Sequence, residues 1–217
     1  KKIYIATSDG IYISADGGKN WTRRNVGTMT SQVRAVAMMS SSPNVLFAGV
    51  YGGGIHKSTN GGITWTPSNS GIENPYGRSV GADPKNSGTI YSAGVHGLYK
   101  SVNAGSTWKL ALSYDSLSVF SNNSEDGAFE ISPVTTSNLF ISALTGEFAR
   151  STDGGGTWTS ATIPPTATLT KVVENVEFDP VNPSTIYFSE NGVWKSTDLG
   201  STWIDISGDL PKSVNGG

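Results

Sequence analysis

The stretch STDGGGTW, residues 151–158, places one serine, one acid, three glycines and one tryptophan within eight positions. Nucleotide-binding loops, calcium loops and hairpin turns all use these residue types, so composition does not choose among them. Recurrence does, because the chain repeats the phrase as SADGGKNW (14–21), STNGGITW (58–65), SVNAGSTW (101–108) and STDLGSTW (196–203).

The serines of the five copies lie at positions 14, 58, 101, 151 and 196, so successive copies are 44, 43, 50 and 45 residues apart. Short runs such as KIYIA (2–6) and TIYFS (185–189) are rich in β-branched and aromatic residues and are bounded by turn formers, which indicates strands. A period of this length is typical of four-stranded propeller blades. We therefore predict an all-β propeller chain built from four-stranded antiparallel blades.

Each repeat has the same order of parts. A first strand, such as residues 33–38, precedes a turn that twice reads Asp-Pro-x-Asn, at 83–86 and 179–182. A second strand, a loop, a third strand, the repeated turn and a fourth strand that opens at the tryptophan then follow. The predicted units within one domain or fragment, 1–217, are approximately 1–27, 28–70, 71–113, 114–163 and 164–210, with 211–217 as a tail or lead-in to a further blade.

The first unit has no first strand, because residue 1 already begins the second one. Two interpretations follow: the tail closes a five-bladed ring, or the chain is part of a ring of six to eight blades. We favour the larger ring, because KSVNGG (212–217) is poor material for an inner strand. An open arc exposes strand edges and apolar blade faces, so we expect self-association.

The repeated turn has a physical interpretation. Its acid accepts hydrogen bonds from backbone N–H groups, its glycines supply positive φ, and its tryptophan packs into the seam between blades. Asn60 and Asn103 replace the acid in two copies, which argues against a calcium loop built on carboxylates. The two histidines, His56 and His96, are too few for a metal site, so we expect no metal and no cofactor.

The composition narrows the class of protein. The chain has 217 residues, 36% of them hydrophobic, and a formal charge of −2, which suits a soluble globular protein and not a nucleic-acid-binding surface. Cysteine is absent, which excludes disulfides and thiolate chemistry. No apolar run is long enough for membrane insertion.

The pattern S-x-[DN]-x-G-x-[TN]-W resembles the Asp-box, or bacterial neuraminidase repeat. This repeat is found in sialidases, xyloglucan-degrading glycosidases with paired propellers, sortilin-type receptors and a photosystem assembly factor. The resemblance implies a β-propeller in which the box is a scaffold on the face opposite the usual active site. Its matching residues here are Ser14, Asp16, Gly18, Trp21, Ser58, Asn60, Gly62, Trp65, Ser101, Asn103, Gly105, Trp108, Ser151, Asp153, Gly155, Trp158, Ser196, Asp198, Gly200 and Trp203.

The resemblance implies ligand sites where the loops between second and third strands and between blades meet. Arginines there can clamp an anion, and tyrosines, Tyr76 among them, can form a sugar platform. The candidates for ligand binding are Arg34, Tyr51, Arg78, His96, Tyr114, Glu147, Glu174 and Glu190.

Three functions fit this fold. We favour a secreted, periplasmic or cell-surface module that binds a glycan or protein ligand or serves in assembly. The alternative is one half of the two-propeller active site of a glycoside hydrolase similar to the xyloglucan-degrading family, with a second propeller as its partner. Hydrolysis needs two carboxylates, and the resemblance implies one on each propeller; Asp9 is the nearest match to the first. A sialidase is disfavoured. Such enzymes use three arginines on the substrate carboxylate and usually show an Arg-Ile-Pro segment near their start, whereas this chain has only five arginines, lacks that segment and is short for the class.

Overall fold

A computed structural model describes residues 1–25, 32–73, 75–116, 126–143, 148–161, 176–189 and 192–210. These residues form nineteen strands and one short 3-10 helix, Tyr114–Ser116. The all-β prediction is therefore confirmed. Within the described residues, no helix has the length and apolar character needed to cross a membrane.

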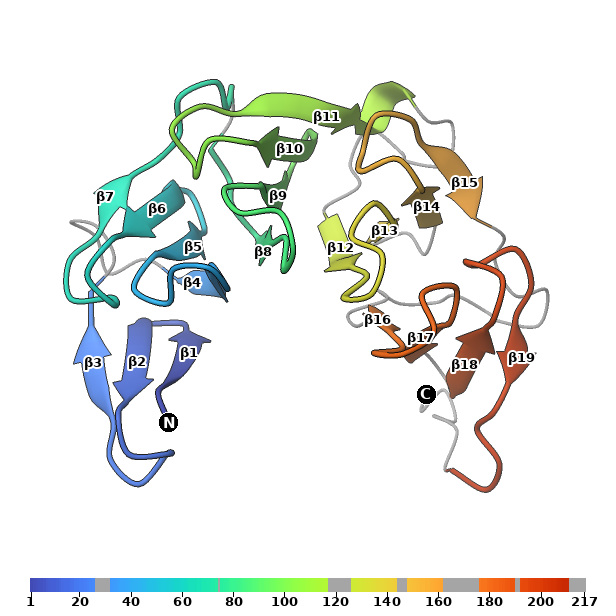
Figure 1. The fold of residues 1–217 in the computed structure, drawn as a ribbon, viewed down its shortest axis with the longest axis horizontal. Coiled ribbons are helices and arrows are strands. Elements are labelled where there is room, and N and C mark those ends of the chain that lie inside the picture. Colours follow the sequence, from blue (N-terminus) through green and yellow to red (C-terminus); the bar gives the residue numbers. More distant parts are fainter. Residues whose placement is uncertain are drawn as a thin grey trace, which may run out of the picture. The chain divides into compact units, whose positions relative to one another are not determined.

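The strands form five antiparallel sheets, which we number as blades 1 to 5 (Figure 1). Blade 1 has three strands and each of the others has four, as the missing first strand of unit 1 predicts. The strands of blades 1 and 2 are β1 (Ile3–Thr7), β2 (Gly10–Ser14), β3 (Thr22–Arg24), β4 (Val33–Met38), β5 (Leu46–Val50), β6 (Gly54–Ser58) and β7 (Thr66–Pro67). Those of blade 3 are β8 (Ser79–Ala82), β9 (Ile90–Gly94), β10 (Gly97–Ser101) and β11 (Lys109–Ser113). Those of blades 4 and 5 are β12 (Asp126–Ile131), β13 (Leu139–Ala143), β14 (Phe148–Ser151), β15 (Thr159–Ala161), β16 (Val176–Phe178), β17 (Ile186–Ser189), β18 (Val193–Ser196) and β19 (Ile204–Asp205).

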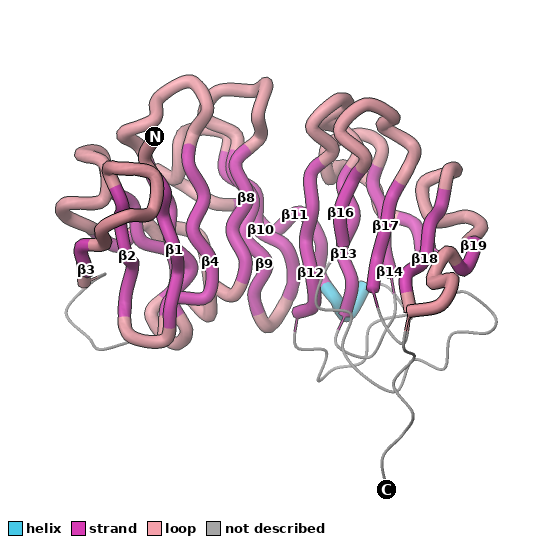
Figure 2. Tube along the Cα trace, turned by 90° about the horizontal axis from the view of Figure 1, so that it is seen from below, coloured by secondary structure: helices cyan, strands magenta, loops and turns pink. Residues whose placement is uncertain are grey.

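The chain divides into two compact units, Lys1–Ala111 and Leu112–Gly217. Blades 1 to 3 lie in the first unit, whose boundary falls inside β11, and blades 4 and 5 lie in the second. In the first unit β4 contacts both β1 and β8, and in the second β12 contacts β16. Within each unit the strands run between two rims of loops (Figure 2). The repeated turns lie on one rim, and the loops after β5 and β9 lie on the other.

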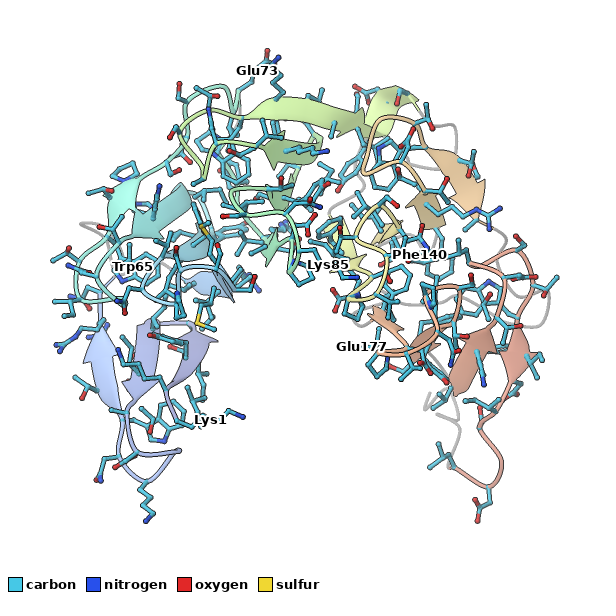
Figure 3. The ribbon with its side chains drawn as sticks, viewed as in Figure 1. Lys1, Trp65, Glu73, Lys85, Phe140 and Glu177 are labelled. Atoms are coloured by element: carbon cyan, nitrogen blue, oxygen red, sulfur yellow. The ribbon has the colours of Figure 1, made fainter. Side chains whose placement is uncertain are left out.

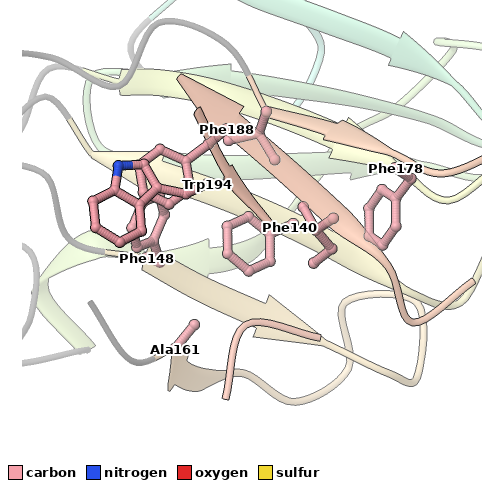
Figure 4. Packing of buried hydrophobic residues seen from close by; sticks show 8 residues of the cluster. Phe140, Phe148, Ala161, Phe178, Phe188 and Trp194 are labelled. Atoms are coloured by element: carbon pink, nitrogen blue, oxygen red, sulfur yellow. The ribbon is translucent and has the colours of Figure 1, made fainter. Parts of the chain in front are cut away.

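Apolar cores fill the seams between neighbouring blades, because each sheet has side chains on both faces. Ile11 of blade 1 meets Ala48 and Val50 of blade 2 in the first seam, and Trp65, labelled in Figure 3, packs against this cluster. In the second seam, between blades 2 and 3, Phe47 of blade 2 and Trp108 of blade 3 belong to one apolar cluster. Between blades 4 and 5 the cluster is largely aromatic, as Figure 4 shows: Phe140, Phe148, Ala161, Val176, Phe178, Ile186, Phe188 and Trp194.

The repeated turn is held by its serine and its acid or amide together. The hydroxyl of Ser101 donates to Oδ1 of Asn103 at 2.9 Å and accepts from the N–H of Gly105 at 2.9 Å. Oδ1 of Asn103 also accepts from the N–H of Thr107 at 2.9 Å. All five serines are at most 2% exposed and all make the same pair of bonds. The predicted role of the acid is confirmed, and the serine is a second, buried centre of the turn.

Positive φ is found where the turn was predicted to need it, at two consecutive residues of each copy. Glycine occupies both positions in three copies, at 17–18, 61–62 and 154–155. Ala104 and Leu199 adopt the same conformation in the other two, with φ of 54° and 57°. The left-handed conformation costs a residue with a Cβ about 1–2 kcal/mol, so these two turns carry local strain.

The tryptophans were predicted to pack in the seams. Trp108 is 3% exposed, its Nε1 donates to the carbonyl oxygen of Ser68 in blade 2 at 2.7 Å, and Trp203 contacts Phe140 of blade 4 at 6.2 Å between ring centroids. The prediction holds for these rings. Trp21 of blade 1 differs, because 38% of its surface is exposed.

Basic side chains join two of the seams from the position just before the box serine. Nζ of Lys57 in blade 2 donates to the carbonyl oxygen of Ala104 in the blade 3 turn at 2.7 Å. Arg150 of blade 4 donates in the same way to Leu199 of blade 5 at 2.7 Å. The corresponding residue of blade 1 is Ile13, which cannot donate such a bond.

Candidate functional site

Four predicted residues come together on the rim opposite the repeated turns, and we call them the Arg–Tyr cluster: Arg34, Tyr51, Tyr76 and Arg78. The guanidinium carbons of Arg34 and Arg78 lie 5.2 and 5.6 Å from the centroid of the Tyr51 ring. Tyr76 meets Tyr51 edge-on, with the ring centroids 5.5 Å apart. Tyr51 is 42% exposed and Tyr76 36%, so both rings reach solvent.

A β-bulge places Arg34. Val33 pairs with Val50 and Ala35 pairs with Gly49, so Arg34 is the extra residue between two consecutive partners. Bulges redirect a side chain at the end of a strand. Tyr51 directly follows β5, and its N–H donates to the carbonyl oxygen of Gln32 at 2.9 Å.

Three glycines place the segment that carries Tyr76 and Arg78. A Cβ on Gly77 would lie 2.7 Å from Cδ1 of Ile55 and 2.9 Å from a backbone oxygen. A Cβ on Gly94 would lie 2.8 Å from the carbonyl oxygen of Tyr76, and one on Gly49 would lie 3.1 Å from that of Gly77. The segment therefore lies directly on blades 2 and 3, which fixes the two side chains between them. The sequence Ala-Gly-Val occurs where the second strand of both blades ends, at 48–50 and 93–95.

The cluster concentrates positive charge beside aromatic surface. Each guanidinium is within cation–π range of the ring, an interaction worth about 0.5–1 kcal/mol at exposed sites. Because both are measured to one centroid, the two guanidinium carbons lie no more than about 11 Å apart. Two guanidinium groups, each with paired N–H donors, suit the carboxylate groups of a ligand.

The other predicted residues lie elsewhere. His96 is exposed in the turn between β9 and β10. Tyr114 is only 4% exposed, so it is core and does not fit the predicted role of a sugar platform. Glu147, Glu174 and Glu190 lie outside the described residues.

Asp9 is tied into the loop between β1 and β2. Its carboxylate accepts a hydrogen bond from Thr7 at 2.7 Å and lies 3.3 Å from Nε of Arg23. The Thr7 hydroxyl, the Tyr12 hydroxyl and the Arg23 charge together lower the pKa of Asp9, although its desolvation opposes this. An ionised, exposed carboxylate of this kind does not fit the protonated acid of a glycosidase.

Glu130 and Glu177 form a pair that the sequence analysis did not predict. They lie on neighbouring strands, β12 and β16 (Figure 3 labels Glu177). Burial raises the pKa of Glu130 to about 7; the N–H of Ile131 opposes this, while the charge of Glu177 and a hydrogen bond with it add to it. Glycosidase carboxyl groups are about 5–9.5 Å apart, which is further than a hydrogen bond spans. The pair thus fits shared-proton contact and not glycoside hydrolysis.

An open groove with a volume of about 270 Å³ lies along the first seam, on the rim of the repeated turns. It is lined by Lys2, Ile13, Asp16, Arg24 and Ile63, among others. The acid of this turn is ionised, because hydrogen bonds from the N–H and side chain of Asn20 and from Ser14 lower the pKa of Asp16 to about 2. In the described part of the chain, no group of three or more histidine, aspartate or glutamate residues could hold a metal ion.

Comparison with protein families and solved structures agrees with this architecture. Residues 12–23 match the BNR/Asp-box repeat. No curated protein matches the chain.

Solved structures of the same fold include glycan-acting enzymes. An ancestral GH74 enzyme has 24% sequence identity and a TM-score of 0.70, over 82% of this chain and 24% of that enzyme. The GH74 xyloglucanase from Xanthomonas campestris has 16% identity and a TM-score of 0.70, over 96% of this chain and 36% of that one. YCF48 from Cyanidioschyzon merolae has 18% identity and a TM-score of 0.67, over 93% of this chain and 65% of that one.

The chain thus spans between a quarter and two thirds of the length of these proteins. At these identities the likeness concerns the fold alone. The repeated turn, the four-stranded sheets and these neighbours agree: the chain carries Asp-box repeats in blades of the β-propeller type.

Proposed function

We propose that this chain is a binding module of an Asp-box propeller and that the Arg–Tyr cluster is its ligand-binding surface. The observation that carries the proposal is the placement of Arg34 and Arg78 against one exposed tyrosine ring, Tyr51. Two fixed cations on a rigid rim favour a ligand with carboxylate groups.

The ligand is an acidic glycan or an acidic segment of a protein. Both guanidinium groups lie beside the Tyr51 ring, so recognition rests on carboxylates more than on stacking of a neutral sugar. Tyr76 adds an exposed aromatic edge beside the two charges. This function needs no reacting pair of carboxylates.

We place the module outside the cytoplasm. One structure of the same fold is the extracellular domain of a putative hybrid two-component system from B. thetaiotaomicron, with 15% identity and a TM-score of 0.70, over 96% of this chain and 26% of that one. The absence of cysteine and the low charge of the chain agree with such a setting.

Titration calorimetry with two probes tests the proposal: a hexagalacturonate and a hexaglutamate peptide, each compared with a neutral hexagalactan. We expect at least one acidic probe to bind, and salt to weaken its binding. Arg34→Gln and Arg78→Gln should each weaken it by about tenfold or more, because each removes a charge-assisted hydrogen-bond donor.

Arg24→Gln is the matched control, since Arg24 is an exposed arginine of β3 outside the cluster. It should leave the affinity unchanged. The proposal fails if neither acidic probe binds, if the neutral glycan binds equally well, or if the two cluster variants bind like the wild type.

A further inference from the structure

The repeated turn of blade 2 contains an Asn-Gly step, Asn60-Gly61, at the position where three other copies have aspartate. Asparagine is chemically labile, and a following glycine has no Cβ to hinder attack of its backbone nitrogen on the side-chain amide. The sequence has three Asn-Gly steps, at 60, 191 and 215, and the structure describes both residues of the first. Asn60 is exposed, whereas Gly61 is buried.

The reaction open to this step is deamidation. The backbone nitrogen of Gly61 bonds to Cγ of Asn60 and loses its proton, the bond from Cγ to the side-chain nitrogen breaks, and ammonia leaves. Water then opens the resulting cyclic imide. Opening at one carbonyl gives aspartate, and opening at the other gives isoaspartate, in which the main chain runs through Cγ. Attack requires the nitrogen and Cγ to come within about 3–3.5 Å in the correct orientation.

The closed turn holds both reacting groups in other bonds. The N–H of Gly61 donates to the carbonyl oxygen of Asn44 at 2.9 Å. Oδ1 of Asn60 accepts from the hydroxyl of Ser58 at 2.9 Å and from the N–H of Thr64 at 3.0 Å, and its Nδ2 donates to Oγ1 of Thr64 at 2.8 Å. Turning the amide toward the Gly61 nitrogen breaks these bonds, so the turn must open before the reaction can occur.

The turn of blade 2 lacks a bond that holds two other turns from outside. The carbonyl oxygens of Ala104 and Leu199 each accept a bond from a basic side chain of the preceding blade. Gly61 stands in the corresponding place of blade 2, where Ile13 of blade 1 has no donor to offer. Asn60 and Gly61 instead line the open groove of about 270 Å³, so water reaches the reacting groups.

An aspartate at position 60 fits the closed turn, as two other copies show. Oδ2 of Asp153 accepts from the hydroxyl of Thr157 at 2.7 Å, and Oδ2 of Asp198 accepts from that of Thr202 at 2.6 Å. Thr64 is the corresponding residue, so its hydroxyl only has to change from acceptor to donor. Desolvation raises the pKa of Asp198, but hydrogen bonds led by those from Thr202 outweigh it and lower the pKa to about 2. The turn thus favours a carboxylate over a neutral group.

We propose that Asn60 is a self-modification site: opening of the blade 2 turn exposes it to the Gly61 nitrogen, and the aspartate product closes the turn again. The modified turn then has the same acid as the copies in blades 1, 4 and 5. The isoaspartate product has an extra main-chain carbon directly before Gly61, so it does not restore the bond to Asn44. The reaction involves no residue of the Arg–Tyr cluster and is independent of the proposed function.

Peptide mass mapping of the full 217-residue chain, kept in mildly alkaline buffer, tests the proposal. Asn60 should convert at least about tenfold faster in urea than in native buffer, because urea removes the protection of the closed turn. Asn103 is the matched control within the same chain. It makes the same bonds in its turn, but it is followed by Ala104, whose φ of 54° is similar to the 71° of Gly61 and whose methyl group hinders the attack. It should convert more slowly than Asn60 in urea.

Two serine variants test whether the turn controls the reaction. Ser58→Ala removes the hydroxyl that bonds both Asn60 and the N–H of Gly62, so conversion of Asn60 in native buffer should become about tenfold faster. Ser101→Ala opens the corresponding turn of blade 3 and should leave the rate at Asn60 unchanged. Circular dichroism checks that each variant is folded. If Ser58→Ala unfolds, Thr64→Val replaces it, because it removes only the partner of Nδ2 and should speed up conversion by about threefold.

Asn60→Asp tests the fit of the product. Its midpoint of urea unfolding at pH 7 should equal or exceed that of the wild type, and a clearly lower midpoint overturns the proposal. Conversion of Asn60 at equal rates in urea and native buffer, or no conversion in either, also overturns it. The same holds if Asn103 converts as fast as Asn60 in urea, or if the folded Ser58→Ala or Thr64→Val variant converts at the wild-type rate.

Discussion

The first and second seams of the molecule join the same kinds of blade by different means. In the second seam the side chain of Lys57 and the indole N–H of Trp108 both donate hydrogen bonds across to the neighbouring blade. In the first seam Ile13 stands in the place of Lys57, and Nε1 of Trp65 donates to Gly62 in its own turn at 3.1 Å. The first seam therefore depends on apolar contact, whereas the second is also cross-bonded.

This difference shows how one position changes the surface of a repeat protein. Where the basic side chain is present, it covers the next turn, as Lys57 and Arg150 do. Where isoleucine replaces it, the groove of about 270 Å³ opens beside Ile13. The side chain at this position thus either donates a hydrogen bond to the next turn or lines a groove beside it.

Replacing the tryptophans by alanine should give the largest losses in the free energy of unfolding, and the size of each loss shows how much its seam contributes. Trp108→Ala should lower the free energy of unfolding by about 3–5 kcal/mol, because it leaves a buried cavity and an unpaired carbonyl. Trp65→Ala should cost less, since its own hydrogen bond does not cross the seam. Trp21→Ala should cost about 1 kcal/mol or less, because Trp21 is partly exposed. Urea unfolding at low protein concentration measures the series. Equal losses for Trp21 and Trp108 would show that these rings act only within their own turns.

Exchanging the side chains at the position just before the box serine should change the stability by intermediate amounts. Lys57→Met should destabilise the chain by about 1–2 kcal/mol, because it removes a partly buried charged donor while keeping the stem. Ile13→Lys should stabilise it by up to about 1 kcal/mol, if the new ammonium reaches the turn of blade 2 as Lys57 reaches that of blade 3. Thermal unfolding measures both, with Lys109→Met, at an exposed lysine of β11, as the control. An unchanged thermal stability of Lys57→Met would show that its hydrogen bond does not stabilise the seam.

The smallest effect at neutral pH, and a distinct one in acid, should come from His56 on the first seam. His56 is 7% exposed on the face of β6 that carries the first-seam side chains, and its Nδ1 is buried without a hydrogen-bond partner. Burial lowers its pKa below the usual value of 6.5. The unfolded chain therefore binds a proton at higher pH than the folded chain, and stability falls as the pH drops below 6.5.

His56→Leu removes this proton uptake. Its free energy of unfolding should be close to that of the wild type at pH 7.5 and should exceed it increasingly below pH 6.5. Urea unfolding of both proteins across this range gives the comparison. Parallel pH profiles would exclude His56 as the source of acid sensitivity.

Local features were predictable because short-range chemistry fixes them. The repeated turn needs glycine, an acceptor and a tryptophan within eight residues, and Asp83 binds the N–H groups of Lys85 and Asn86 as the Asp-Pro-x-Asn signal indicates. The sequence also contains a lysine or arginine directly before the box serine in every copy except the first. Their role across the seam depends on the packing of a neighbouring blade, which no single repeat encodes.

The site was predictable only in part for the same reason. Arg34 and Arg78 were both predicted as ligand-binding residues, but their approach to the ring of Tyr51 depends on a bulge and on close glycine contacts. Tyr114 was expected to be accessible and is buried, because it lies in a helical turn against the core. The contact of Glu130 with Glu177 joins residues from two blades and has no local signal.

The direction of the seams has a consequence for synthesis on the ribosome. Trp108 and Trp203 each contact the blade that precedes them in the chain. When such a tryptophan emerges, the sheet that receives it has already been made, and the turn beside it closes through bonds between residues two to four apart. Local turns of this kind form with little loss of chain entropy. Within each unit a new blade can thus add to a finished surface, so vectorial folding there proceeds in chain order.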